Sequence, residues 1–267
     1  VLPDRTVLQG MKILTAHSNL DVEVEFIYHK PLILDLRIEG GILSLDDLGG
    51  VGNMPFTGAG PTTGHIYGLS KDLQIDVHTQ LEDFGLWSYR LGDVETDAFW
   101  HARDDLIFEN LVAQLGETTY GGDGRVIFGK PIQLDGRLAI DGGRVEDVVG
   151  IFSDRLDIAG SFDGVIDLAG PVRELGGEVW IRGRKVHALG EEFSSIQIAA
   201  TAHNGRFTFN DSWFRKGRGG IYSRGYIDTH GPVNLELFSY ALDLEQVDHL
   251  SGSALTARLA LDVHLWG

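Results

Sequence analysis

Two glycine-rich stretches are the first places where this chain could do chemistry. Residues 58–64 read GAGPTTG, and residues 217–220 read GRGG. A phosphate-binding loop needs a strand before it and a helix after it, because backbone N–H groups and the helix N-terminus hold the phosphate. The residues that follow position 64, HIYGLSKDLQIDV, alternate in the way that strands do. We therefore predict a turn at 58–64 and a hairpin connection at 217–220.

Adjacent carboxylates are the next candidates, at Asp46–Asp47 and at Asp104–Asp105. Successive residues of a strand point to opposite faces, so neither pair places a general acid and a general base on one side. We interpret both pairs as solvated charges that discourage unwanted pairing at sheet edges.

The ten histidines are scattered singly, without the spacing that zinc ligands adopt on a helix. His29 and His230 occupy equivalent positions of the repeat described below, but the middle copy has Gly129 there, which argues against a shared ligand role. No Gly-x-Ser-x-Gly nucleophile motif occurs, and cysteine is absent. We predict that the protein is not an enzyme and that it has no metal or cofactor.

Charge and composition restrict the possible partners further. The 267 residues include 22 basic and 39 acidic ones, giving a net charge of −17, which argues against binding to nucleic acid or flat docking on anionic lipid. No run of 18 apolar residues occurs. Glycine, at 36 residues, is about twice its usual share, which favours many turns and bulges. The chain begins at Val1 and ends in LDVHLWG, so we expect a segment of a longer protein.

A short phrase recurs at intervals of about a hundred residues: HKPLILDL at 29–36, GKPIQLDG at 129–136 and HGPVNLEL at 230–237. The residues around each proline recur at fixed offsets as well. Eleven before are Leu20, Tyr120 and Ile221; five before are Phe26, Val126 and Ile227; sixteen after are Asp47, Asp147 and Asp248. Repeats of this kind indicate stacked supersecondary units. We predict one elongated domain with the end of a repeat at 1–51, full repeats at 52–152 and 153–251, and the start of another at 252–267.

Alternation with a period of two predicts an all-β fold. Strands are expected at 177–189, 194–202, 205–211 and 219–229, with a tight hairpin at the HNG of 203–205. Each repeat is long enough for six to eight strands, with the proline opening a strand and a short helical turn sixteen residues later. The fold class that we expect is an elongated, curled, mostly antiparallel sheet built from repeats of about 100 residues.

The apolar residues of these strands fall on one alternating register, which permits two interpretations. They form either the packed core of an ordinary β-sandwich or the wall of an apolar trough that binds a ligand. For any single residue the packed core is the simpler interpretation. For the whole set, a long curled sheet without a covering layer would expose a continuous apolar surface.

The chain is similar to the TamB branch of the AsmA-like superfamily. The similarity lies in residues 164–250, where a glycine-bounded strand leads into LGGEVWI, an apolar hairpin, a glycine-rich connection and a last alternating strand that ends in LDLEQV. Residues 64–152 repeat this order, whereas YRLGDVETDAFW in the middle copy is longer and more polar than its counterpart.

This resemblance implies a β-taco sheet whose hydrophobic groove carries phospholipid acyl chains between the inner and outer membranes and supports outer-membrane assembly. It also implies a Gram-negative periplasmic location, an inner-membrane anchor, and an outer-membrane barrel partner of the Omp85 type that binds outside this segment. The isolated segment could dimerise through its edge strands. The candidate groove residues are Leu32, Leu34, Leu36, Phe108, Ile132, Leu134, Ile181, Phe207, Phe209, Ile227, Val233, Leu235 and Leu237.

Two other functions stay open at this point. A β-solenoid or adhesin-like protein with a packed core would act through its surface and would have no room for a ligand. A carbohydrate-binding β-sandwich would use exposed aromatic residues, for which Trp100, Trp180 and Trp213 are the candidates.

Overall fold

The computed structural model describes most of the chain. The described residues are 4–28, 31–47, 56–69, 72–86, 89–101, 105–147, 158–171, 174–188, 190–203, 206–228, 232–243, 258–259 and 262–266. Sixteen strands form one antiparallel sheet in the order of the chain, from β1 to β15 and then β18, and two very short strands, β16 and β17, pair with each other. The predicted fold class, an all-β chain with an open and curled antiparallel sheet, is confirmed.

The strands are long, and most have between eight and fifteen residues. Their bounds are β1 Arg5–Leu14, β2 Asn19–Ile27, β3 Ile33–Ser44, β4 Phe56–Leu69, β5 Asp72–Leu86, β6 Tyr89–His101, β7 Asp105–Leu115, β8 Thr118–Ile127, β9 Gln133–Arg144, β10 Ile158–Pro171, β11 Gly176–Ala188, β12 Glu191–His203, β13 Arg206–Lys216, β14 Gly219–Asp228, β15 Val233–Tyr240, β16 Leu242–Asp243, β17 Arg258–Leu259 and β18 Asp262–Trp266. A short helical turn, Leu45–Asp47, follows β3, and another follows β9 at 145–147.

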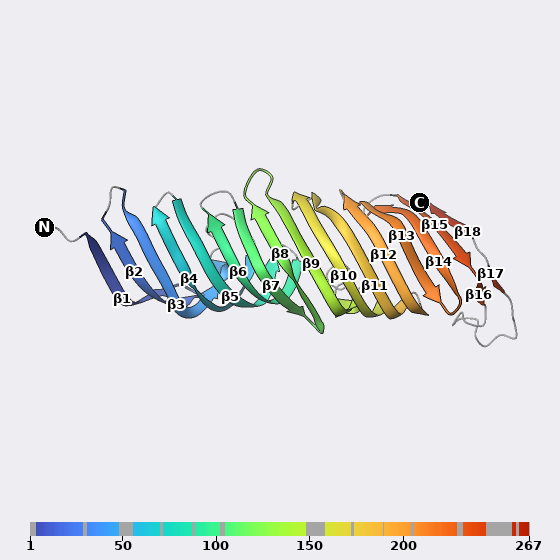
Figure 1. The fold of residues 1–267 in the computed structure, drawn as a ribbon, viewed down its shortest axis with the longest axis horizontal. Coiled ribbons are helices and arrows are strands. Elements are labelled where there is room, and N and C mark those ends of the chain that lie inside the picture. The colour runs from blue at the N-terminus through green and yellow to red at the C-terminus, as the bar shows by residue number, and fades with distance from the viewer. Residues whose placement is uncertain are drawn as a thin grey trace. The chain divides into compact units, whose positions relative to one another are not determined.

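The chain divides into two compact units, which are described separately. Unit 1 comprises residues 1–116 and 121–133, and unit 2 comprises residues 117–120 and 134–267. Within each unit, consecutive strands lie side by side (Figure 1). The repeat boundaries that we predicted after residues 51, 152 and 251 lie in segments outside the described residues and stay a prediction.

The recurring prolines all lie at the same end of the strands. Pro31 and Pro131 each stand two residues before a strand, β3 and β9, and Pro232 stands directly before β15. We call the side of the sheet formed by these strand ends the proline edge. The side formed by the opposite strand ends, where β3 ends in its helical turn, is the helical-turn edge. Equivalent strands are six apart, which agrees with the predicted six to eight strands per repeat.

One face of the sheet carries the core, and we call it the inner face. In unit 1, Leu20, Val22, Val24 and Ile38 form a buried cluster, against which Leu34, Leu36 and Val77 pack among others. In unit 2, Val186, Phe193 and Ile196 form the equivalent cluster with Ile198, Phe214 and Ile221. Burial of these side chains, about 1.5–3 kcal/mol for each large one, is the main term that holds each curled sheet together.

Glycines on the inner face let side chains meet across an intervening strand. Ile38 pairs with Gly64 and Gly64 pairs with Val77, so the three lie in line on β3, β4 and β5. A Cβ on Gly64 would stand 2.6 Å from Val77 Cγ1. The missing side chain leaves the space in which Ile38 and Val77 approach each other. Part of the high glycine content therefore comes from the narrow inner side of the curl and not only from turns.

The stretch GAGPTTG corrects one prediction, because it lies inside β4 and not in a turn. A Cβ on Gly60 would come within 1.7 Å of the carbonyl oxygen of Gln80 on the neighbouring strand. Close backbone approach, and not chain reversal, is the physical reason for glycine at this position. The other glycine-rich stretch does form the predicted connection, since β13 ends at Lys216 and β14 begins at Gly219. At the predicted hairpin of 203–205, His203 pairs with Arg206, and the turn residues 204–205 lie outside the described residues.

Bulges bend the strands between the two edges. Asp83, Asn110 and Lys185 adopt left-handed backbone conformations within strands. The pairing of β5 with β6 shifts register at Asp83, and the pairing of β6 with β7 shifts register at Asn110, between Glu109 and Val112. The backbone N–H of Asp83 donates to Asp93, and that of Asn110 donates to Asp123. Bulges increase local twist and curvature, so they supply the curl that composition alone did not reveal.

Candidate functional site: the inner apolar face

An unbroken row of apolar residues crosses unit 1 on the inner face. Each member is the directly paired neighbour of the next on the adjacent strand, from β1 to β7. The row is Leu8, Val24, Leu36, Ile66, Ile75, Trp100 and Leu106. Directly opposed residues of antiparallel strands share a face, so these side chains form one continuous surface.

Unit 2 has a second row of the same kind, from β10 to β18. Its members are Ile166, Val179, Ala200, Phe209, Gly225, Leu235 and Leu265. A parallel row nearer the proline edge pairs Phe207 with Ile227 and Ile227 with Val233. We call the two seven-residue sets the apolar rows. Neither contains a charged or hydrogen-bonding side chain apart from the indole of Trp100.

The inner face is not equally covered at its two edges. Along β5, Leu73, Ile75 and Val77 near the proline edge are half-buried, whereas Leu81 and Phe84 near the helical-turn edge are 4% exposed. In unit 2, Val186 and Ile196 toward the helical-turn edge are at most 1% exposed, while Leu235 is half-buried and Leu265 is 46% exposed. Along these strands the helical-turn half is packed more closely and the proline half is partly open, although Val24 and Ala200 in the apolar rows and Val126 near the end of β8 are also buried.

The predicted groove residues lie in the partly covered half. Eleven of the thirteen are in strands, and Leu32 and Ile132 come directly before β3 and β9. None is buried: Leu32 and Phe207 are exposed at 43% and 36%, and the others are half-buried. The pairings above place Leu36, Phe209 and Leu235 in the apolar rows. Their role in binding lipid stays a prediction.

Sequence reasoning missed several members of the same surface. Ile66, Ile75 and Leu106 belong to the row in unit 1, and Ile166 and Leu265 belong to the row in unit 2. The signal was present for Ile75, because the segment LQIDV alternates clearly. It could not show which strands are paired, and the row is defined only by that pairing.

A hydroxyl group and a carboxylate fasten the helical-turn edge in unit 1. The Ser44 backbone N–H donates to Ser18 Oγ at 2.9 Å, and Ser18 Oγ donates to the Asp47 carboxylate. Thr15 Oγ1 donates to the same carboxylate. This arrangement, the first clamp, ties the start of β2 to the end of β3 and to the helical turn.

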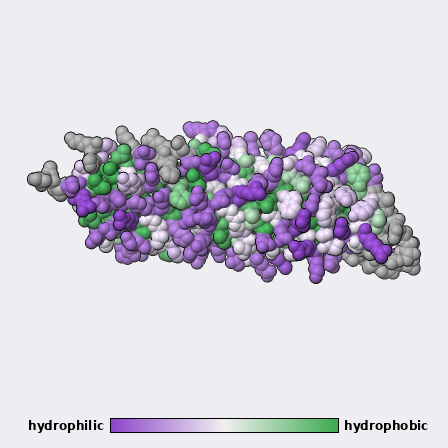
Figure 2. Space-filling view, in the orientation of Figure 1, coloured by the Kyte–Doolittle hydropathy of each residue, from purple (hydrophilic) through white to green (hydrophobic). Residues whose placement is uncertain are grey.

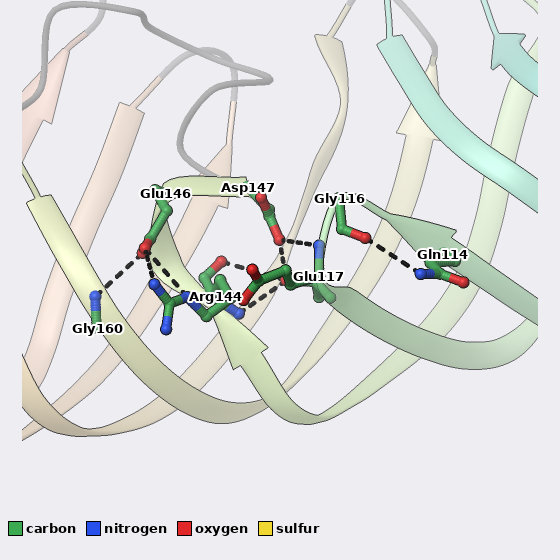
Figure 3. A network of polar contacts seen from close by, with 8 residues as sticks. Gln114, Gly116, Glu117, Arg144, Glu146, Asp147 and Gly160 are labelled. Carbon is green, nitrogen blue, oxygen red and sulfur yellow. Dashed lines mark hydrogen bonds and ion pairs between the residues drawn. The ribbon is translucent and has the colours of Figure 1, made fainter.

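The second clamp repeats the first one a hundred residues later, in unit 2. The Arg144 N–H donates to Thr118 Oγ1 at 2.7 Å, and Thr118 Oγ1 donates to Asp147 Oδ2 at 2.8 Å. Asp147 Oδ2 also accepts the Glu117 N–H at 2.9 Å, and Glu146 accepts the Gly160 N–H at 3.0 Å (Figure 3). The hydroxyl and carboxylate residues of the two clamps lie at the same distances along the chain from Pro31 and Pro131, respectively.

The third repeat departs from this pattern. Gly219 stands where Ser18 and Thr118 stand, and it has no hydroxyl group. A Cβ on Gly219 would lie 2.3 Å from the carbonyl oxygen of Ala241. The backbone therefore occupies the space that a clamp side chain would need. Asp248, the counterpart of Asp47, lies outside the described residues.

The first clamp changes the electrostatics of Asp47 and corrects our interpretation of that residue. Hydrogen bonds from Ser18 and then Thr15 favour the charged carboxylate and lower the pKa of Asp47 to about 2. His17 Nδ1 lies 3.1 Å from Asp47 Oδ1 and acts in the same direction. Asp47 is therefore a half-buried structural acceptor and not a solvated charge, whereas Asp46 is exposed as expected. Asp104 lies outside the described residues, and Asp105 pairs with Arg125 at 3.4 Å.

The three tryptophans of the carbohydrate hypothesis lie on different faces. Trp100 is in the inner apolar row, with its ring 6.1 Å from that of Phe128, and its Nε1 is buried without a hydrogen-bond partner among the described residues. It cannot present that group to a glycan. Trp180 and Trp213 are on the opposite, outer face, each beside an arginine. In the view of Figure 2 the surface is mainly hydrophilic, with hydrophobic residues in separate groups.

The described residues contain no group of three or more His, Asp or Glu side chains placed to hold a metal ion. In the same part of the chain, no helix has the length and apolar character needed to cross a membrane. Comparison with known protein families, curated proteins and solved structures finds no match for this chain. The geometry of the inner face is therefore the basis on which a function can be argued.

Proposed function

We propose that this chain is a segment of a lipid-transfer protein whose inner face holds the acyl chains of phospholipids. The observation that carries the proposal is the apolar row in each unit, together with the half-exposed residues between it and the proline edge. A water-exposed apolar surface of this continuity normally marks a binding site. Each CH₂ group kept out of water contributes about 0.8 kcal/mol, so even part of one acyl chain would gain several kcal/mol on this surface.

The chemistry of the wall favours movement along it and not capture at one point. Aliphatic side chains such as Leu36, Ile66 and Leu235 interact with an acyl chain without directional bonds. Successive positions along a row therefore have similar energies, and a lipid can slide from strand to strand. Its polar head group stays in water at the proline edge, because burying that group in the apolar face would cost several kcal/mol.

The wider setting that we propose follows the resemblance to the TamB branch. In it, the segment belongs to a periplasmic protein anchored in the inner membrane of a Gram-negative cell. The protein carries phospholipid toward the outer membrane and contacts an Omp85-type partner through another region. The reaction is physical transfer without bond making or breaking, so no residue is assigned a catalytic role.

One observation favours the second candidate, a structural protein with a packed core. The clusters around Val22 and Ile196 are buried, with further apolar side chains packed against them, as a core without a ligand would be. The two functions differ in what they predict for the proline half of the inner face. A structural protein needs only the packed half, whereas a lipid-transfer protein needs the other half to be accessible.

Site-specific photo-crosslinking tests the proposal directly. A photoreactive residue is placed at Leu134 or Leu235 on the inner face, and at Gln133 or Asn234 as the matched outward-facing controls. The protein is incubated with phosphatidylethanolamine and phosphatidylglycerol vesicles, irradiated and analysed by mass spectrometry. We expect lipid adducts at Leu134 and Leu235 and at least tenfold fewer at the controls. Equal labelling at both pairs, or none at either, contradicts the proposal.

A single substitution separates binding from folding. Leu235→Asp places a charge in the apolar row of unit 2 and is expected to reduce lipid transfer between vesicles by at least tenfold. Because Leu235 is only half-buried, the thermal unfolding transition should stay cooperative. Loss of the folded state would assign Leu235 to a dry core and favour the structural protein.

A further inference from the structure

The outer face of β11–β13 carries two arginines without a carboxylate partner. The Arg182 guanidinium lies over the Trp180 ring, 4.8 Å from its centroid, and Arg215 lies 5.4 Å from the centroid of the Trp213 ring. Neither arginine makes an ion pair within the described part of the chain, although acidic residues outnumber basic ones by 39 to 22. Stacking on an indole holds each guanidinium in place and leaves its N–H groups free for an external anion.

Strand pairing gathers these residues on one surface. Arg182 pairs with Gln197 and Gln197 with Trp213, while Trp213 pairs in turn with Tyr222 on β14. Arg215 lies two residues from Trp213 on the same strand and face. Tyr222 is 45% exposed. We call Arg182, Gln197, Trp213, Arg215 and Tyr222 the arginine–tryptophan patch.

The equivalent surface of unit 1 shows that the fold does not require this patch. There Gln80 pairs with Glu95 and Glu95 with Val112, at the positions of Arg182, Gln197 and Trp213. Gln114 stands at the position of Arg215. Unit 1 thus builds the same three strands with carboxylate, valine and glutamine. The arginines and the tryptophan of unit 2 are not needed for the sheet and call for another explanation.

We propose that the arginine–tryptophan patch binds an acidic polysaccharide. Trp213 and Tyr222 lie on adjacent strands about 4.8 Å apart, so a linear glycan that crosses the strands can rest successive sugar rings on successive aromatic rings. Arg182, in line with these rings on β11, and Arg215, beside Trp213 on β13, would donate paired hydrogen bonds to sugar carboxylates. This function is separate from the proposed lipid transfer, which uses the inner face.

The charges around the patch favour a single polysaccharide chain over an anionic membrane surface. Asp163 and Glu178 are on the same outer face, on β10 and β11. Asp163 pairs directly with Arg182 and therefore borders the patch. An anionic membrane would bring its charge against both carboxylates, whereas a single polysaccharide chain can run from Arg182 toward Tyr222, away from β10. The occupant that the surface fits is therefore a linear anionic glycan and not a lipid bilayer.

Tryptophan fluorescence and affinity electrophoresis with polygalacturonate test the proposal, with neutral dextran of similar length as the comparison. We expect retardation by polygalacturonate at low salt that weakens as salt is added, and at least tenfold weaker retardation by dextran. The variant Trp213→Val with Arg215→Gln gives unit 2 the residues of unit 1 and should weaken binding at least tenfold. Its matched control, Val112→Ala with Gln114→Ala, should bind as the unchanged protein does.

Three outcomes would overturn the proposal: no retardation by polygalacturonate, equal retardation by dextran, or binding only to phosphatidylglycerol vesicles. Circular dichroism establishes that each variant is folded. If the double substitution does not fold, the exposed Arg215→Gln alone takes its place, with a smaller expected loss of about three- to tenfold. An unchanged affinity in that variant contradicts the proposal equally.

Discussion

The two halves of the inner face are built from the same kinds of residue and behave differently. Toward the helical-turn edge, Val186 and Ile196 are sealed from water, and in the first two repeats a clamp fastens the strand ends. Toward the proline edge, Leu235 and Phe207 belong to the same alternating pattern but are partly open to water. The difference teaches that alternation shows which face of the sheet is apolar but does not show how far water reaches each part of that face.

The largest expected effect comes from truncating one large side chain in each half of the inner face and comparing the two losses of stability. Ile196→Ala should lower the free energy of unfolding by about 2–5 kcal/mol, because it leaves a cavity in a closed cluster. Leu235→Ala should cost less than about 1.5 kcal/mol, because solvent already reaches that side chain. Urea unfolding followed by circular dichroism measures both. Equal losses would show that the inner face is one continuous packed core.

The second clamp offers a smaller and more local test. Thr118→Val keeps the side-chain volume but removes the hydroxyl that joins the Arg144 N–H to Asp147. Leaving the Arg144 N–H unpaired, with Asp147 keeping only the Glu117 N–H, should cost about 1–3 kcal/mol. Thr119→Val, one residue later and exposed, is the matched control and should change stability by less than about 0.5 kcal/mol. Hydrogen exchange at the helical-turn end of β9 should rise in the first variant only.

The first clamp adds a dependence on pH, and this is the smallest of the expected effects. The pKa of Asp47 is lowered to about 2 by hydrogen bonds from Ser18 and Thr15, below its ordinary value of 3.8. Its stabilising contribution is therefore complete above pH 3.8 and is lost as the pH falls toward 2. Thermal unfolding of the unchanged protein and of Asp47→Asn should differ at pH 6 and converge near pH 2. A constant difference across this range would contradict the assignment.

The strands and their repetition could be predicted from the sequence, because both depend on patterns of neighbouring residues. Period-two alternation found β11 to β14, and the recurring prolines gave the interval between equivalent strands. The clamps also left a signal that was not used, since Ser18 and Thr118 stand at the same offset from the repeated aspartates. A repeated hydroxyl and a repeated carboxylate could have been predicted to meet.

Other features could not be read from the sequence, for physical reasons. Gly60 was predicted to lie in a turn. Its glycine is required because a neighbouring strand comes very close, and that strand lies twenty residues further along the chain, so a local pattern cannot show it. The bends at Asp83 and Asn110 rely on left-handed conformations that these residue types adopt only in particular surroundings. Leu34 and Val22 look alike in the sequence, yet Val22 is buried and Leu34 is only half-buried in the fold.

The six-strand interval between equivalent strands has a consequence for scale. Neighbouring strands are about 4.8 Å apart, so β1 to β7 within unit 1 spans about 29 Å. That span is close to the thickness of the hydrocarbon core of a bilayer, about 30 Å. On the proposed function, the six-strand interval within unit 1 would give an acyl chain roughly one membrane thickness of apolar surface for about a hundred residues.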